Sequence, residues 1–512
     1  MSQLKQKKYT KIKNFYCSYF SKHQILQFDL STNFLGSNSR LGIGLSRCEN
    51  LIDLYLNFNK CQLKIVGMQK LCDGLVKCNK LEFLQMDFTK NMIKNEGASI
   101  LGTYLKNIVN LEQLSINLKK NKIGNIGVKN LVQGIGQSQK LKRLRLILDE
   151  NNIDKGANDL ALSSEYLGNS LQVLDISLYG NQIDCDCELE TGIALLNLPN
   201  LKSLVLNFTY QLIRSEFTKE SIFDQQNQQN QISLENQHNL LAFSLYSYQQ
   251  RVIQNNERYQ LLISALAQKT KLLHLEFFPA YRYENLKDDI CHVLENCLNI
   301  STLSLMLNDF ADKDVQVLGS VLEKNTNIQK LFLFLQHNNK LGDQGTLQLF
   351  NSLPNIINLQ NLLLDLSYKQ INDQGIQNLG IALIKCINLK DLKLRLYQIG
   401  DQGVKLLFSS LAKCTNISNL SLNLRGNQIG DDGISLLTFN QSLQVLSLDF
   451  GYNNISRSVL NLAHQLACIN LQSLTLNLFY NKINLSQKLA VESECLKSKR
   501  LVVFKINFLS SI

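Results

Sequence analysis

The stretch LKDLKLRLYQIGDQGVKLLFSSL, residues Leu389–Leu411, contains the two periods that decide the fold. Its first eight residues follow the pattern Leu-x-x-Leu-x-Leu-x-Leu, whose alternating apolar residues are typical of a strand with one buried face. Further on, Val404, Leu407 and Leu411 recur with the period of a helix. The stretch therefore predicts a short strand, a turn and an amphipathic helix.

The strand pattern recurs along the chain. It begins every 30 residues at Leu51, Leu81, Leu111, Leu141, Leu171 and Leu201, and again at Leu240, Leu272, Ile300, Ile328, Leu359, Leu389, Ile417, Leu443, Leu471 and Leu501. A weaker copy begins at Ile25. One unit cannot bury its apolar helix face alone, whereas a stack of units can. The chain is predicted to be an α/β solenoid of about 16–17 repeats.

Two polar motifs separate strand from helix. The motif Asn-x-Ile, at Asn121, Asn181, Asn427 and Asn481, predicts an Asn side chain that hydrogen-bonds to the backbone of the bend. The motif Gly-Asp-x-Gly, or a close variant, follows in several units. It predicts that the aspartates are helix N-caps, at Asp343, Asp373, Asp401 and Asp431.

The repeat that runs from Leu389 through Ile399-Gly-Asp-Gln-Gly-Val404 resembles the ribonuclease-inhibitor-like class of leucine-rich repeats. That class includes ribonuclease inhibitor, the repeat domains of nucleotide-binding innate sensors and the activating protein of the Ran GTPase. The resemblance extends from about residue 25 to residue 512. It implies a horseshoe with parallel strands on the concave face and helices on the convex face. Many units depart from the class by an extra Leu-x step before the Asn, which predicts a strand two residues longer.

Charge and composition suggest the domain organisation. Residues 1–24 contain no Asp or Glu and six lysines, so they account for six of the formal net charge of +11 and leave +5 for the rest. We interpret 1–24 as a solvated basic leader or cap and 25–512 as the solenoid, with a Gln/Asn-rich loop inserted at 211–239. A nearly neutral solenoid argues against a dedicated nucleic-acid binder and leaves only weak contact through the basic N-terminus.

The cysteines and glycines do not form a recognisable chemical site. Six cysteines lie three residues before a repeat begins, which predicts small buried groups rather than disulfides: Cys48, Cys78, Cys297, Cys386, Cys414 and Cys468. Cys185-Asp-Cys187 has no second matched pair for zinc, and the six histidines have no metal spacing. Gly42-Ile-Gly44 and Gly134-Ile-Gly136 lack the rest of a phosphate loop, so we interpret them as glycines at repeat corners. No enzyme, metal or cofactor is predicted.

The sequence has no apolar window long enough to cross a membrane and no apolar signal core after its charged start. We therefore expect no membrane association and a cytoplasmic protein, with a nuclear location as the alternative.

The outward residues of the predicted strands are the third, fifth and seventh of each repeat, and most are small and polar. Adjacent units depart from this with large apolar residues and one lysine: Phe278, Met306, Lys330, Phe332, Phe334 and Leu363. Such a group predicts a protein-binding hot spot, unless the irregular segment near Pro279 or the Gln/Asn-rich loop covers it. Two basic spots, Arg143 with Arg145 and Lys393 with Arg395, are predicted either to pair with carboxylates of a partner or to remain solvated.

These patterns predict a non-catalytic scaffold or adaptor that binds partner proteins on the concave face. The alternative, which the resemblance implies, is a GTPase-activating protein for a Ran-like small GTPase. The chain lacks the acidic C-terminal tail often found among such activators, because it ends in Lys497-Ser-Lys-Arg500 and a mostly apolar segment.

Overall fold

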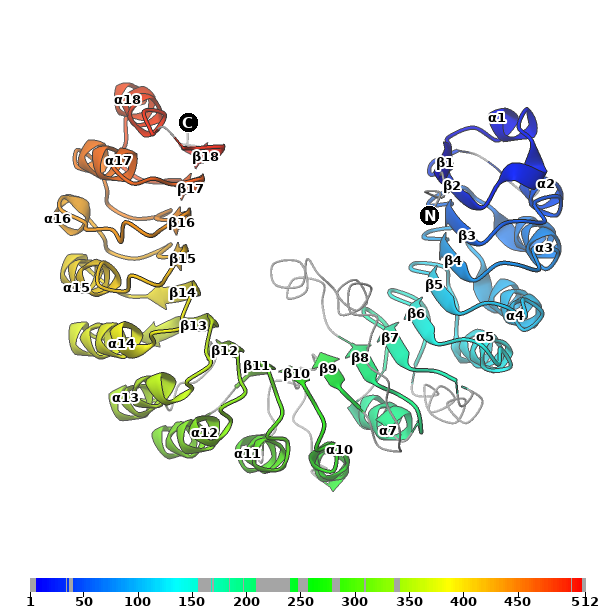
Figure 1. The fold of residues 1–512 in the computed structure, drawn as a ribbon, viewed down its shortest axis with the longest axis horizontal. Coiled ribbons are helices and arrows are strands. Elements are labelled where there is room, and N and C mark those ends of the chain that lie inside the picture. Colours follow the sequence, from blue (N-terminus) through cyan, green and yellow to red (C-terminus); the bar gives the residue numbers. More distant parts are fainter. Residues whose placement is uncertain are drawn as a thin grey trace. The chain divides into compact units, whose positions relative to one another are not determined.

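The computed structural model describes residues 6–33, 35, 40–154, 167, 170–183, 185–196, 198–208, 240–246, 257–278, 286–307, 310–335, 341–498 and 500–508. The chain divides into two compact units, whose helices and strands carry the labels of Figure 1. Unit 1 comprises Met1–Leu272 with Pro279–Tyr281, and unit 2 comprises Leu273–Phe278 with Arg282–Ile512.

The described strands of unit 1 pair in parallel, each with the next in sequence. They are β1 (Gln6–Tyr9), β2 (Ile25–Asp29), β3 (Asp53–Asn57), β4 (Phe83–Asp87), β5 (Gln113–Asn117), β6 (Arg143–Ile147), β7 (Val173–Ser177), β8 (Ser203–Asn207) and β9 (Ala242–Tyr246). The helices are α1 (Ile12–Tyr16), the 3-10 helix η1 (Phe20–Lys22), α2 (Leu41–Leu45), α3 (Lys64–Leu75), α4 (Lys94–Leu105), α5 (Asn125–Gly136), α7 (Cys185–Leu196) and α10 (Glu257–Ala267).

Unit 2 has the same arrangement of parallel neighbouring strands. They are β10 (His274–Phe278), β11 (Thr302–Met306), β12 (Lys330–Phe334), β13 (Asn361–Gln370), β14 (Asp391–Tyr397), β15 (Asn419–Asn423), β16 (Val445–Asp449), β17 (Ser473–Asn477) and β18 (Val503–Asn507). The helices are α11 (Leu286–Asn296), α12 (Asp312–Lys324), α13 (Asp343–Ser352), the 3-10 helix η6 (Leu353–Asn355), α14 (Asp373–Lys385), α15 (Asp401–Leu411), α16 (Asp431–Ile434), α17 (Val459–Ala467) and α18 (Leu485–Cys495).

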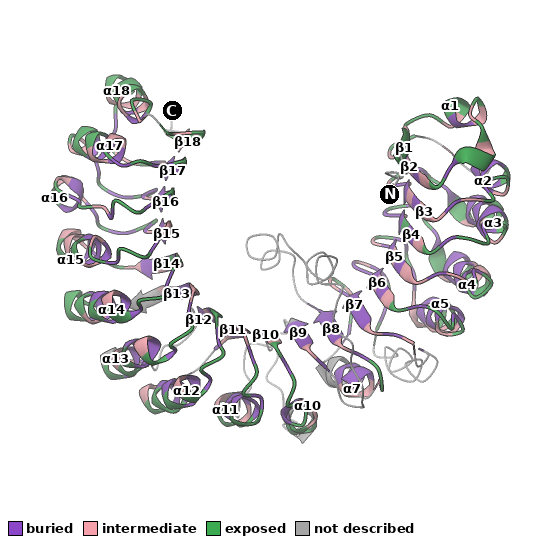
Figure 2. Cartoon of the chain, in the orientation of Figure 1, coloured by how far each residue is buried: buried purple, intermediate pink, exposed green. Residues whose placement is uncertain are grey.

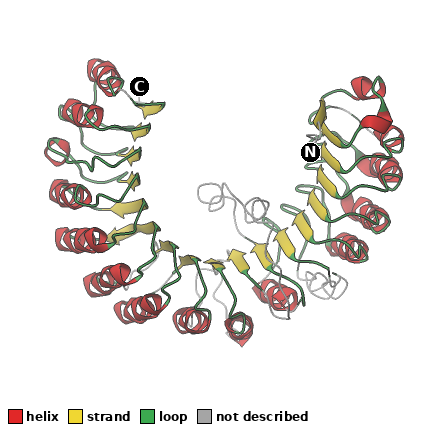
Figure 3. Ribbon diagram, in the orientation of Figure 1, coloured by secondary structure: helices red, strands yellow, loops and turns green. Residues whose placement is uncertain are grey.

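Each repeat buries one face of its strand, as the alternating pattern predicts. In β5, Leu114 and Ile116 are buried, whereas Gln113, Ser115 and Asn117 are partly exposed. In each unit taken alone, the strands form one layer and the helices form a second layer along one face of it (Figure 3). Because parallel strands alternate with helices that cover one face of the sheet, each unit is an α/β leucine-rich-repeat solenoid, which confirms the predicted fold class.

The predicted role of the turn asparagine is confirmed. Asn121 is fully buried, and its Nδ2 donates to the carbonyl oxygens of Phe88 and Leu118, both at 2.9 Å. Its Oδ1 accepts from the backbone N–H groups of Asn91 (2.9 Å) and Ile93 (3.3 Å) in the preceding repeat. One side chain thus satisfies four backbone groups that the bend would otherwise leave unpaired.

The prediction that aspartates cap their own helices is wrong. They are the first residues of the helices rather than the residues before them: Asp343, Asp373, Asp401 and Asp431. Asp401 Oδ1 accepts a hydrogen bond from the N–H of Gly430 at 2.6 Å, and Asp431 Oδ1 accepts from Ser456 at 2.8 Å. Because these amides belong to the next repeat, Asp401 and Asp431 each connect two neighbouring repeats.

The glycines predicted at repeat corners lie inside helices. Gly42 is in α2 and Gly134 is in α5. A Cβ on Gly134 would stand 2.1 Å from the carbonyl oxygen of Gly102 in α4, and one on Gly42 would stand 2.0 Å from that of Lys70 in α3. The corner interpretation is therefore wrong, since these glycines let the backbones of adjacent helices touch.

The shared cysteine position is buried in five of its six members, and Cys468 is exposed. Every cysteine whose side chain the structure describes is free. The Gln/Asn-rich loop, the segment after Phe278 and the side chains of Cys185 and Cys187 lie outside the described residues.

The basic N-terminal segment is folded in its described part. Strand β1 pairs with β2 in the register Lys8↔Gln27, and the buried Phe15 packs against Phe28 with ring centroids 4.9 Å apart. Lys7 and Lys8 are exposed. The described part of this segment therefore extends the sheet, and these two lysines stay exposed.

Candidate functional site

The apolar residues predicted to form a hot spot lie on adjacent strands of unit 2. In the sheet register Ser304 of β11 faces Phe332 of β12, which in turn faces Leu363 of β13. Met306 faces Phe334 in the next outward row, and the ring of Phe334 lies 5.4 Å from that of Phe278. The structure therefore brings these predicted residues together on the sheet face opposite the helices.

Their exposure divides the group in two. Phe278, Phe334 and Leu363 are each only 3% exposed, although they lie on the outward face. Met306 and Phe332 are partly exposed, and Lys330 is exposed. The second group is what this face offers to a partner. Burial on both faces also occurs in unit 1, where β7 and β8 are buried along their whole length (Figure 2).

The two predicted basic spots each contain an arginine that is paired within the chain. Arg145 Nε lies 3.1 Å from Asp175 Oδ2 on the neighbouring strand, and Arg395 Nη1 lies 3.3 Å from Asp365 Oδ2. Burial lowers the pKa of Arg143, which is partly exposed. Lys393 is exposed. A partner carboxylate at either spot would compete with an aspartate already in place.

The turn that follows the strand has an unusual backbone conformation in several repeats. The tenth residue of several repeats adopts the left-handed backbone conformation, with positive φ at Lys60, Lys90, Lys120, Glu150, Gly180, Gln398, Gly426, Tyr452 and Tyr480. Such a conformation suits glycine and is unusual for a bulky residue. We call this row of turns the strand-to-helix edge.

At this edge, unit 2 carries a stacked group of Arg425, Tyr452, Phe479 and Tyr480, here called the 425–480 cluster. The guanidinium carbon of Arg425 lies 4.5 Å from the ring centroid of Tyr452. The Tyr452 ring lies 4.3 Å from that of Tyr480 and 5.7 Å from that of Phe479. Tyr452 is 42% exposed and Tyr480 is 41% exposed. Aromatic rings and a cation are thus stacked at the surface.

Sequence reasoning missed this cluster because it searched only the alternating positions of the strands. Arg425 and Phe479 are the ninth residues of their repeats, and Tyr452 and Tyr480 are the tenth, so both positions lie beyond the strand pattern. Comparing the tenth positions would have shown tyrosine in two consecutive repeats, at Tyr452 and Tyr480.

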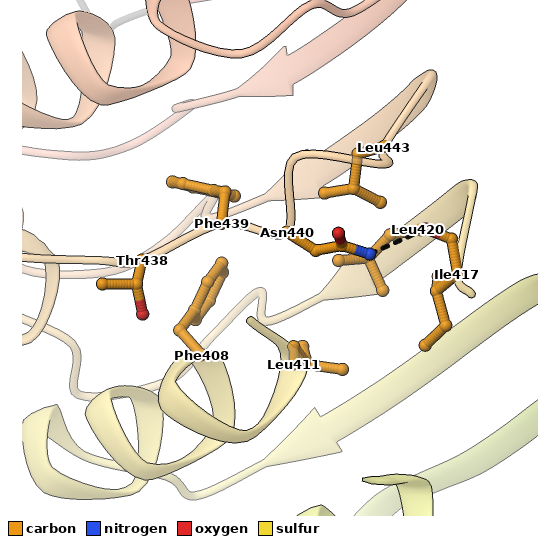
Figure 4. A pocket seen from close by; sticks show the side chains of 8 residues that line it. All are labelled: Phe408, Leu411, Ile417, Leu420, Thr438, Phe439, Asn440 and Leu443. Carbon is orange, nitrogen blue, oxygen red and sulfur yellow. Dashed lines mark hydrogen bonds between the residues drawn. The ribbon is translucent and has the colours of Figure 1, made fainter. Parts of the chain in front are cut away.

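A small hollow lies between the repeats that begin at Leu389 and Ile417 (Figure 4). The second of these is short, and its helix α16 covers only four residues, so Phe439 packs against Phe408 with ring centroids 5.2 Å apart. Asn440 Nδ2 closes the gap by donating to the carbonyl oxygens of Cys414 (2.6 Å) and Ile417 (3.0 Å). The hollow has room for at most one water molecule, so it is a packing feature rather than a ligand site.

Among the described residues, no group of three or more His, Cys, Asp or Glu side chains is placed to hold a metal ion. None of their helices combines the length and apolar character needed to cross a membrane.

Comparison with known proteins gives structural likenesses only. No family model matches the sequence, and no curated protein matches it. Among solved structures, it is similar to a chain of the crystal structure of the TLR13–ssRNA13 complex, with 19% identity, 96% of this chain covered and a TM-score of 0.46. It is also similar to a chain of the crystal structure of the Rad7 and Elc1 complex in yeast, with 16% identity, 91% of this chain and 87% of that chain covered, and a TM-score of 0.41. The chain spans 60% of the length of the first of these.

Proposed function

We propose that this chain is a non-catalytic scaffold that binds partner proteins through unit 2. The observation that carries the proposal is the 425–480 cluster, with Met306 and Phe332 on the sheet face as a second contact area. Protein interfaces are enriched in Tyr, Phe and Arg, and a few such side chains supply most of the binding energy. The cluster places these residue types together at the surface.

The backbone at the two tyrosines has the left-handed conformation that this turn also adopts in other repeats. Tyr452 has φ 55° and Tyr480 has φ 53°, whereas Gly180 and Gly426 occupy equivalent positions in other repeats. A non-glycine residue held in a sparsely populated region costs on the order of 1 kcal/mol. Glycine can therefore replace either tyrosine without backbone strain.

We also propose the ribonuclease-inhibitor-like class for the repeats, because long helices such as α3 and α5 follow five-residue strands. A cytoplasmic or nuclear location is our further proposal. The free cysteines of the described residues support it, because disulfides persist mainly in oxidising compartments.

The test compares three forms of the tagged full chain in native cell extract, after brief chemical crosslinking and quantitative mass spectrometry. The first is wild type, and the second carries Arg425→Ser, Tyr452→Gly and Tyr480→Gly. Glycine suits the φ values of both tyrosines, so this variant should fold. The third is a matched control with Tyr19→Ser and Arg500→Ser, which removes the same residue types from exposed positions elsewhere.

We expect partners crosslinked to unit 2 in wild type to fall at least tenfold in the cluster variant and to persist in the control. Equal recovery from all three forms would remove the cluster as the binding site. Stimulation of GTP hydrolysis by a purified Ran-like GTPase would instead favour the alternative function.

A further inference from the structure

The strand-to-helix edge of unit 1 differs in chemistry from that of unit 2. Its exposed residues include lysines from three consecutive repeats: Lys60, Lys64, Lys90, Lys94, Lys120 and Lys122. Lys60, Lys90 and Lys120 are the tenth residues, equivalent to Tyr452 and Tyr480 in unit 2. Neighbouring strands are about 4.8 Å apart, so the lysines form a continuous row, here called the lysine edge.

Most of these ammonium groups have no counter-charge from the protein. Lys120 Nζ pairs with Glu150 Oε2 at 2.6 Å. Within the described part of the chain, the side chains of Lys60, Lys64, Lys90, Lys94 and Lys122 form no ion pair or hydrogen bond. The lysine edge therefore presents uncompensated positive charge.

The surrounding sequence strengthens this field. Residues 1–147 contain 24 Lys and Arg against 8 Asp and Glu, a net charge of +16. The remaining residues contain 29 Lys and Arg against 34 Asp and Glu, a net charge of −5. The charge of +5 for residues 25–512, on which we based our expectation against nucleic acid, thus combines +10 over residues 25–147 with −5 over residues 148–512.

We propose that the lysine edge binds the phosphate backbone of a single-stranded nucleic acid, independently of base sequence. Lysine is depleted at protein interfaces, whereas Arg and aromatic residues are enriched there, as in the 425–480 cluster. Lysine ammoniums are compact charges on flexible stems and suit phosphate oxygens that need no planar pairing. A flexible single strand can follow a row of such charges.

The adjacent sheet face limits where the strand can lie. The outward positions of β2, β3 and β4 include Asp29, Asp53 and Asp87, and burial, with the nearby charge of Glu82, raises the pKa of Asp53. Carboxylates repel phosphates, so contact is confined to the edge, and the bases face solvent or the turn backbone.

The test measures fluorescence anisotropy of a labelled oligouridylate, long enough to span three repeats, against the full chain over a range of NaCl concentrations. The edge variant carries Lys60→Gln, Lys64→Gln, Lys90→Gln and Lys94→Gln. The control removes the same charge from exposed lysines of unit 2, with Lys324→Gln, Lys385→Gln, Lys390→Gln and Lys413→Gln. Far-ultraviolet circular dichroism and Tm verify that both variants remain folded.

We expect the edge variant to lose at least tenfold in affinity and about 3 in the slope of log K against log salt, because each single-strand phosphate contact contributes about 0.7. The control should bind within about twofold of wild type. The proposal is overturned if wild type does not bind, if both variants lose equally, or if poly-glutamate competes better than unlabelled oligouridylate. The last result would identify an acidic protein segment as the ligand. None of these outcomes bears on the 425–480 cluster.

Discussion

Asn121 illustrates how single residues hold this fold together. Its side chain bonds to Phe88 and Ile93 of the preceding repeat, while its own N–H donates to Asn151 Oδ1 of the next at 2.9 Å. Asn91 and Asn151 form equivalent bonds in their own turns. The buried asparagines therefore form a continuous row of hydrogen bonds, here called the asparagine ladder, in which each side chain connects adjacent repeats.

We predict that Asn121→Ala destabilises the protein by about 2–3 kcal/mol, because it leaves buried backbone N–H and C=O groups without partners. Asn481→Ala should cost less, since Asn481 is partly exposed and water can replace its bonds. Thermal unfolding followed by circular dichroism measures both. Equal shifts in Tm for the two variants would show that burial of the asparagine does not determine how much its hydrogen bonds stabilise the protein.

The cysteines provide a second prediction for single residues. Burial raises the pKa of Cys48 and of Cys78 to about 12, so almost no thiolate forms at pH 8. Cys17 and Cys468 are exposed. Iodoacetamide at pH 8 should therefore modify Cys17 and Cys468 first and reach Cys48 and Cys78 only after denaturation. Peptide mapping by mass spectrometry gives the order, and early labelling of Cys78 would contradict the described burial.

Contacts between helices depend on glycine where their backbones meet. In α4 and α5 the Cβ of an alanine at position 134 would overlap the carbonyl oxygen of Gly102. Neither helix can yield by rotating a side chain, because the contact is with backbone. The α4–α5 pair is thus closer than ordinary side-chain packing allows.

Gly134→Ala should therefore lower stability by about 1–3 kcal/mol through overpacking, even though alanine favours helices. Gly400→Ala is the matched control. An added Cβ there meets nothing within 4 Å, and its φ of −100° is accessible to alanine. Chemical denaturation of both variants tests the difference. A Gly134→Ala protein as stable as the control would mean that α4 and α5 separate easily.

The sequence predicted the strands, the helices and the turn asparagines because these depend on local periods. It failed for Asp401 and Gly134, whose partners lie in other repeats about 30 residues away. It located Phe332 and Phe334 on the outward face of one strand but could not indicate that only Phe332 remains accessible. Tyr452 and Tyr480 were missed because they lie after the strand, outside its alternating pattern.

Across the whole molecule, charge is distributed unevenly along a uniform repeat. The first 147 residues carry +16 and the remainder −5, while the strands and helices of both parts repeat the same pattern. Repulsion between like charges opposes the compact state, and salt screens it. The repeats near the lysine edge should therefore gain stability from salt, whereas those of unit 2 should gain little.

Hydrogen exchange measured by mass spectrometry tests this expectation on the intact chain. Raising NaCl from about 10 mM to about 100 mM shortens the Debye length from about 30 Å to about 10 Å. Exchange in β5 should slow about threefold, or roughly 0.7 kcal/mol of local opening free energy. Strand β15 serves as an internal control, because it has the same length and burial pattern and lies in unit 2. If both strands respond equally, salt acts through general effects on exchange or solvation, and the concentrated charge of the first 147 residues does not limit the stability of their repeats.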